Sequence, residues 1–395
     1  MRVLHLVSNC KLTGPVDPAI RLAHALGDLS ADSRVAVGRL HPGDGSIDDL
    51  VRDRGLEPVR DLLLPKHRRF FANRADVRKL SAMLRAEPVE ILHAHLDNAH
   101  ATAARARGTL GDGRGPLIVR SLYDDTTPPA TGRYRWLLGQ ESDGVIVFSE
   151  GIRSGLIERF ELAPERVVAM PGAVLTDRFY PRPPGQDLRQ RLDIPRDAVV
   201  IGIVARIQRH RRFHVLFEAM QRVMAQMPDV YLLVLGRGTH AEEIAHETVK
   251  RLGISERTRL PGYIGGDDYP VALASFDVKG FLVPGSDGTC RAVREAMACG
   301  VPVIAARRGL LPEIVRDGVD GFIVEDEVEP LAAAILRLAR DRDLRRTLGA
   351  NALRRAREDF CQRKQAEKVL ALYQSWLDLG RSSDRTAGLG NKVVR

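Results

Sequence analysis

The stretch GSDGTCRAVREAMACGVPVIA, residues 285–305, runs from a polar turn through a predicted helix into an apolar strand. A second apolar run, FDVKGFLVP at 276–284, precedes it, so two predicted strands flank one predicted helix. A strand–helix–strand unit of this kind makes the two strands parallel neighbours. Short apolar runs alternate with helical segments along most of the chain, which predicts an α/β protein with doubly wound parallel sheets.

The length of the chain indicates more than one domain. Its 395 residues exceed the ~250–300 residues that one hydrophobic core usually reaches. The segment at 180–198 is rich in proline and charge and separates two sets of strands, as an inter-domain linker does. We therefore expect two similar-sized Rossmann-like domains at residues 1–180 and 181–360. A C-terminal helix is expected at 361–380 and a disordered tail at 381–395.

The overall composition indicates which classes of binding partner and which cellular compartment to expect. A net charge of +9 favours anionic partners, whereas an aromatic content of 5% argues against nucleic acid. No apolar run reaches the ~20 residues of a membrane span, and we see no signal peptide. Four scattered cysteines without a CxxC pair indicate free thiols in a cytoplasmic protein.

Two carboxylates lie eight positions apart where the loop of the opening stretch becomes a helix. Asp287 stands at the predicted helix start, and Glu295 lies about two turns further, roughly 12 Å along the axis. A helix start binds anions, and Gly288 lets a phosphate approach the backbone closely. One nucleotide could place its phosphates there and its ribose at Glu295. The alternatives are an ordinary N-cap for Asp287 and a solvated helix position for Glu295.

The run EAMACGVPVIA, with an acid–glycine pair upstream, resembles the retaining glycosyltransferases of family four, which have the GT-B fold. Those enzymes carry two glutamates separated by seven residues, followed by Ala-Met-Ala and Gly-x-Pro-Val-Val; here Asp287 stands in place of the first glutamate. The likeness covers nearly the whole chain and includes DVYLLVLGRGTHAEEI (229–244), LLPEIVRDGVDGFIV (310–324) and FCQRKQAEKVLALYQSW (360–376). It implies two Rossmann-like domains facing a central cleft, with the C-terminal helix returning to the first domain.

By this resemblance the donor is a nucleotide diphosphate sugar, bound mainly by the second domain. Two cations after the first strand of that domain hold the diphosphate, and GIVARIQRHRRFHVLFEAM places Arg206 and Arg211 at those positions. Fixed guanidinium groups suit this task because negative charge develops on the leaving diphosphate.

The resemblance also assigns roles to the residues around the helix start. It places the ribose on Glu295 and the donor sugar or its phosphate near Asp287. Gly236 and Gly238 form a Gly-x-Gly loop that either belongs to the donor site or is an ordinary tight turn. Backbone amides facing sugar and phosphate oxygens are expected at Gly288, Thr289 and Cys290.

The predicted first domain departs from the family pattern. Gly14 is half of the family's Gly-Gly loop, and Tyr123 replaces a histidine that often ends the VRSLY strand. Either Tyr123 donates a hydrogen bond at the sugar or neighbouring groups take over that role. His93 and His95 are interpreted as structural. The resemblance implies an enzyme without metal or resident cofactor, with the nucleotide sugar as co-substrate.

The segment PKHRRFFANRADVRKL, residues 65–80, holds six Lys or Arg residues and the Phe70-Phe71 pair. On a helix it would suit an anionic membrane leaflet or a lipid-pyrophosphate acceptor. The alternative is a solvated cationic helix whose aromatic side chains pack inward.

These features predict a retaining sugar transfer to the hydroxyl of a saccharide or lipid-linked acceptor, in the synthesis of a cell-surface polysaccharide, lipopolysaccharide or glycolipid. Two alternatives remain. A non-catalytic relative would bind a nucleotide sugar or glycan without turnover. A dinucleotide-dependent oxidoreductase should open its first helix with G-x-G-x-x-G, which SNCKLTGPV does not contain.

Overall fold

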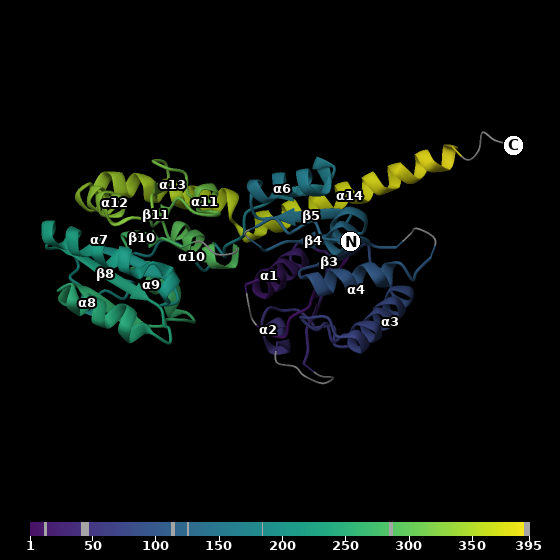
Figure 1. Ribbon diagram of the computed structural model, residues 1–395, viewed down its shortest axis with the longest axis horizontal. Coiled ribbons are helices and arrows are strands. Elements are labelled where there is room, and N and C mark those ends of the chain that lie inside the picture. Colours follow the sequence, from purple (N-terminus) through teal and green to yellow (C-terminus); the bar gives the residue numbers. More distant parts are fainter. Residues whose placement is uncertain are drawn as a thin grey trace. The chain divides into compact units, whose positions relative to one another are not determined.

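The computed structural model describes most of the chain. The described residues are 1–11, 14–40, 47–111, 115–124, 126–183, 185–283 and 287–390, and for 287–289 and 380–390 the description covers the backbone only. The chain divides into two compact units. Unit 1 comprises Met1–Gly172 with Gln362–Arg395, and unit 2 comprises Ala173–Cys361. Each unit has its own sheet and its own covering helices (Figure 1).

Unit 1 is built on a parallel sheet with the strand order β2-β1-β3-β4-β5-β6. Within the described residues its strands are β1 (Arg2–Val7), β2 (Asp32–Val37), β3 (Ile91–Ala94), β4 (Leu117–Ser121), β5 (Gly144–Val147) and β6 (Val167–Ala169). Its helices are α1 (Val16–Gly27), α2 (Asp48–Arg52), α3 (Phe70–Ala86), α4 (Asp97–Arg107), α5 (Gly132–Tyr134), α6 (Glu150–Phe160) and α14 (Gln362–Gly390), with a π-helical segment η1 (Arg135–Gln140) and a 3-10 turn η2 (Pro164–Arg166).

Unit 2 repeats this plan with the strand order β12-β11-β10-β7-β8-β9. Within the described residues its strands are β7 (Val199–Val204), β8 (Val230–Leu235), β9 (Thr258–Gly262), β10 (Val278–Phe281), β11 (Val303–Ala306) and β12 (Gly321–Val324). Its helices are α7 (Phe213–Gln226), α8 (Glu247–Arg251), α9 (Asp268–Leu273), α10 (Asp287–Ala298), α11 (Leu311–Ile314), α12 (Val328–Arg340) and α13 (Arg342–Asp359), with short segments η3 (Gln190–Leu192), η4 (Arg209–Arg211), η5 (Glu242–His246) and η6 (Ser255–Arg257).

The central strands are buried on both faces. Every residue of β3, β5, β10 and β11 is buried, because helices cover both sides of a doubly wound sheet. Some strand residues are polar and nevertheless buried, among them His5, His93, Arg120 and Lys279. Buried polar groups generally need hydrogen-bond partners, which sets these side chains apart from the apolar core around them. Among the described helices, none combines the length and the apolar composition needed to cross a membrane.

The division between the units falls earlier than the boundary expected after residue 180. The Val174 amide donates to the Phe360 carbonyl at 2.7 Å, and Val174, Phe179 and Leu188 pack in the core of unit 2. The segment that resembled a linker therefore starts unit 2.

Helix α14 belongs to unit 1 (Figure 1). Its residues Ala366, Val369, Tyr373 and Trp376 are buried in one cluster with side chains of β1, β3 and α1. A Cβ atom at Gly144 would lie 2.5 Å from the Trp376 ring, so glycine permits this close approach. The helix continues to Gly390, and residues 391–395 lie outside the described part. The disordered tail expected at 381–395 stays a prediction.

Candidate functional site

The carboxyl ends of β7 and β10 form the topological switch point of the unit 2 sheet. The two strands pair directly in parallel, and the chain then continues to opposite sides of them. Arg206 follows β7, and α10 follows β10. Ligands of doubly wound sheets bind at such a switch point. The topology therefore brings together the two segments that the sequence marked for diphosphate binding.

Arg206 and Arg211 are electrostatic neighbours at this place. Arg206 is exposed, and Arg211 is half-buried in η4. Burial lowers the pKa of Arg211, the charge of Arg206 lowers it further, and Cys290 acts in the opposite direction. Two arginines thus approach each other and the first turn of α10. The Nε atom of Arg211 is buried without a hydrogen-bond partner among the described residues, so this guanidinium still has a donor to offer an anion.

The other arginines of this turn already have carboxylate partners. Arg209 binds Glu243 at 2.6 Å on the surface, and Arg212 binds Asp326 at 2.8 Å. Within the described part of the chain neither Arg206 nor Arg211 forms such an ion pair. The structure therefore separates two cations that are paired with carboxylates from two that, among the described residues, remain available.

Gly236 and Gly238 support the segment that carries Arg206. A Cβ atom at Gly236 would lie 1.9 Å from the Ala205 carbonyl oxygen, and one at Gly238 would lie 1.9 Å from the Ile207 carbonyl oxygen. The Ile207 amide donates to the Arg237 carbonyl at 3.1 Å. Glycine at both positions thus lets the 236–238 backbone contact the 205–207 backbone on either side of Arg206. An ordinary tight turn does not require this close contact between two segments.

Helix α10 begins at Asp287, as expected from the sequence. Loop residues 284–286 and the side chains of Asp287 and Thr289 lie outside the description, so the expected contacts of Asp287, Gly288 and Thr289 stay predictions. Cys290 is fully buried in the unit 2 core. Only its backbone is therefore available for the expected amide contact.

Glu295 is buried, which rules out a solvated helix position. It is 5% exposed, its Oε2 accepts a hydrogen bond from the Tyr269 hydroxyl at 2.7 Å, and the Arg291 Nε lies 3.7 Å from its Oε1. Burial and the neighbouring Glu295 raise the pKa of Tyr269 well above its ordinary value. The tyrosine therefore stays protonated and holds the carboxylate in one orientation.

Lys279 was not identified from the sequence, although a lone lysine inside the apolar run FDVKGFLVP was a visible signal. Its Nζ atom is fully buried and has no hydrogen-bond partner among the described residues. The rings of Phe276 and Phe281 lie 5.8 and 5.5 Å from it. Burial lowers the Lys279 pKa from 10.5 to about 7, against the opposing effect of Glu295.

This lysine makes unit 2 less stable at neutral pH than under basic conditions. Between pH 7 and pH 10.5 the unfolded chain holds the Lys279 proton and the folded chain has released it, so stability rises with pH across that window. We expect Lys279→Met to raise the Tm at pH 7 by at least about 5 °C, with a smaller gain near pH 10.5. Calorimetry measures the Tm of the wild type and of the variant at both pH values. Lys250→Met, at an exposed site in α8, is the control, and a gain of equal size at both pH values would contradict this reading.

In unit 1, Tyr123 is buried and its hydroxyl lies 2.8 Å from the His95 Nδ1. Its ring stacks on Phe148, with centroids 4.9 Å apart. The direct hydrogen bond to a sugar that the sequence suggested would have to compete with this buried contact. Gly14 is half-exposed just before α1, and the neighbouring residues 12 and 13 lie outside the description.

His5, His93 and His95 form a buried cluster beside Tyr123. Their ring nitrogens lie within 4.8 Å of one another. Burial lowers the pKa of all three imidazoles, and the nearby Arg120 adds to this for His93 and His95. A further cation beside Arg120 would be repelled. The His93 nitrogens face the Tyr373 hydroxyl and the Ser121 hydroxyl, so the cluster connects β3, β4 and α14 as neutral hydrogen-bonding groups.

Two protein-family models match the chain. The model described as Glycosyltransferase Family 4 matches residues 19–178, and the model described as Glycosyl transferases group 1 matches residues 185–355. Together they cover most of both units. The chain belongs to glycosyltransferase family 4.

Relatives and solved structures agree with this family. D-inositol 3-phosphate glycosyltransferase of Salinispora tropica is 33% identical over 249 residues, 59% of this chain and 51% of the relative. N-acetyl-alpha-D-glucosaminyl L-malate synthase of Bacillus anthracis is 24% identical over 305 residues, 75% of this chain and 76% of that protein. The chain thus spans about half the length of the inositol-phosphate relative.

The Anabaena HepE crystal structure in complex with UDP superposes with a TM-score of 0.78 at 21% identity, over 95% of this chain and 100% of HepE. At this sequence identity the match supports the fold only. It confirms the predicted GT-B class with two doubly wound units.

Proposed function

We propose that this family 4 protein transfers a sugar from a nucleotide diphosphate sugar to an acceptor hydroxyl with retention at the anomeric carbon. The supporting observation is the pair Arg206 and Arg211, without carboxylate partners among the described residues and next to the first turn of α10. Two repelling cations at a helix start are a site for a dianion or trianion. A nucleoside diphosphate leaving group has that charge.

In the proposed reaction the bond between the anomeric carbon and the diphosphate oxygen breaks through an oxocarbenium-like state. Arg206 and Arg211 stabilise the negative charge that develops on this oxygen. The acceptor oxygen forms its bond on the same face, and its proton passes to the departing diphosphate. Glu295, oriented by Tyr269, binds the ribose hydroxyls. Because side-chain cations neutralise the diphosphate, the proposal includes no metal ion, and turnover should survive EDTA.

A donor screen tests this proposal. UDP-, GDP- and ADP-sugars are compared by thermal shift, because a ligand that binds the folded state raises the Tm. UDP-sugars come first, since HepE was solved with UDP. Proton NMR of the product then reports the anomeric configuration. An inverted product would contradict retention. Donor binding without transfer or hydrolysis would favour the non-catalytic alternative.

The acceptor is proposed to belong to a cell-surface polysaccharide, lipopolysaccharide or glycolipid, and residues 65–80 are proposed to contact an anionic membrane surface. Phe70 and Phe71 are 59% and 84% exposed at the start of α3, so the alternative in which these aromatics pack inward is wrong. Basic side chains flank this exposed pair, a combination suited to anionic lipid.

Liposome sedimentation tests the membrane proposal. We expect Phe70→Ser with Phe71→Ser to weaken binding to phosphatidylglycerol vesicles at least about tenfold, because the two aromatic side chains proposed to insert into the membrane are lost. Leu379→Ser removes an exposed apolar side chain elsewhere in unit 1 and should have little effect. Vesicle binding that survives both the phenylalanine changes and neutralisation of Lys66, Arg68, Arg69 and Arg74 would exclude this surface.

A further inference from the structure

Unit 1 contains an open cavity of about 530 Å³ that the proposed donor site does not use. The first turn of α3, the helix α4 and the α5–η1 segment enclose it. Its volume lies in the usual range of small-molecule sites. Four arginines and two aromatic side chains form most of its wall, namely Arg68, Arg74, Arg105, Arg133, Phe70 and Trp136.

The four arginines have no carboxylate partner among the described residues. Burial lowers the pKa of Arg105, and the charges of Arg68 and Arg133 lower it further, so these guanidiniums repel one another across the cavity. The nearby acid Asp97 does not relieve this repulsion, because Arg120 holds one of its oxygens at 2.7 Å and Tyr134 the other at 2.6 Å. Four clustered positive charges therefore remain without compensation.

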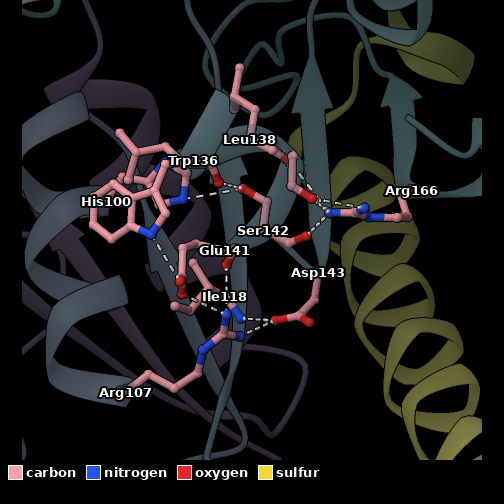
Figure 2. Close-up of polar contacts among 11 residues, drawn as sticks. His100, Arg107, Ile118, Trp136, Leu138, Glu141, Ser142, Asp143 and Arg166 are labelled. Atoms are coloured by element: carbon pink, nitrogen blue, oxygen red, sulfur yellow. Dashed lines mark hydrogen bonds and ion pairs between the residues drawn. The ribbon is translucent and has the colours of Figure 1, made fainter. Parts of the chain in front are cut away.

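The Trp136 side of the aromatic wall is fixed in position. The Trp136 Nε1 donates to the Glu141 Oε1 at 3.0 Å, and Arg107 binds both Glu141 and Asp143 (Figure 2). The Arg105 guanidinium lies 5.1 Å from the Trp136 ring centroid. This network holds the indole and the arginine above it in one orientation before any ligand binds.

A polar group in the wall also lacks a partner. Asn73 lines the cavity and is 8% exposed. Its Oδ1 accepts from the Arg69 amide at 2.7 Å, whereas its side-chain nitrogen is buried without a hydrogen-bond partner among the described residues. An unsatisfied buried donor costs stability, and an acceptor-rich ligand would satisfy it.

We propose that this cavity binds a phosphate or diphosphate group. Phosphate matches the forked donors of arginine and supplies several acceptor oxygens for Asn73. The fixed aromatic wall suits the sugar or chain that the phosphate carries. That this group belongs to the acceptor rests on the proposed function; the binding itself does not. The phosphate can be free, as in a sugar phosphate, or part of a lipid.

Calorimetric titration with inorganic pyrophosphate and with glucose 1-phosphate measures the soluble arm. The cavity variant is Arg74→Gln with Arg133→Gln, and the donor-site variant is Arg206→Gln with Arg211→Gln. Arg69→Gln with Arg78→Gln is the matched control, because it removes the same charge from the same surface without altering the cavity lining. Sedimentation with vesicles containing phosphatidic acid, compared with phosphatidylglycerol, measures the lipid arm.

We expect two separable pyrophosphate sites in the wild type. The cavity variant should weaken one at least tenfold, about the value of one charge-assisted hydrogen bond, and the donor-site variant should weaken only the other. A second outcome supports a lipid-borne phosphate. In that case the cavity variant loses a preference for phosphatidic acid that the wild type shows, while the weak binding of soluble phosphates is unchanged. Equal losses of pyrophosphate affinity, and of the preference for phosphatidic acid, in the cavity and control variants overturn the proposal. Wild-type binding by the cavity variant in both arms overturns it as well. If the cavity variant behaves as expected but the donor-site variant keeps both pyrophosphate sites, the proposed function is contradicted and the cavity proposal is not.

Discussion

Replacing Arg206 and Arg211 by alanine is expected to lower kcat/KM for sugar transfer at least about a hundredfold, the usual cost of removing a group that stabilises transition-state charge. Both cations lie at the carboxyl end of β7 beside the first turn of α10. In the free protein they repel each other, so the charge of the leaving diphosphate is the partner they lack. Steady-state kinetics and donor titration of the double variant measure the effect.

The same turn provides a matched control. Arg209 is exposed and pairs with Glu243 at the surface, where an ion pair contributes little. Arg209→Ala should therefore keep kcat/KM within about threefold of the wild type. The double variant should also keep the wild-type Tm or exceed it, since its repulsion is relieved. Wild-type transfer by the double variant would refute the assignment of the donor site.

Glu295→Ala is expected to have an effect of similar size, with kcat/KM lowered at least about a hundredfold. The carboxylate is buried, held by Tyr269 and close to Lys279. A charged acceptor fixed in this way can bind two ribose hydroxyls, and these contacts hold the diphosphate against the arginines. Donor affinity and single-turnover rate should both fall.

Two companion variants separate this role from folding. Glu295→Gln keeps the side-chain volume and an acceptor for Tyr269, so its Tm should stay close to that of the wild type while transfer falls. Tyr269→Phe removes only the hydroxyl that orients Glu295; we expect a raised KM for the donor with a smaller change in kcat. If Glu295→Ala folds normally and binds and transfers the donor as the wild type does, Glu295 is not a donor residue.

The sequence predicted the central strands and the edge strand β2, and it missed the edge strands β6 and β9. The strands β7, β8, β10 and β11 carry long apolar runs because helices cover both of their faces, and that pattern is local. The strand β9 reads Thr-Arg-Leu-Pro-Gly and β6 has three residues. These two strands are partly exposed and β6 is also short, so they lack the apolar run that marks a buried strand.

The start of α10 and the candidate cations could also be predicted, since a loop that becomes a helix after a buried strand has a recognisable local pattern. The sequence could not tell which cations of RIQRHRR were available. Arg209 and Arg212 are paired with Glu243 and Asp326, which lie far along the chain. Nor could it show that the Tyr123 hydroxyl faces His95 inside the unit.

The sequence by itself thus determined the alternation of strands and helices, the two-unit plan and the position of the helix start, because each depends on neighbouring residues. Only the tertiary structure decided which polar groups have partners. Among the described residues, Arg206, Arg211, the buried Lys279 and the four arginines around the unit 1 cavity lack an opposite charge as partner. A polar side chain finds its hydrogen-bond or ion-pair partner among residues that packing brings together from distant parts of the chain. Burial then sets the free-energy cost of a polar group that has no partner.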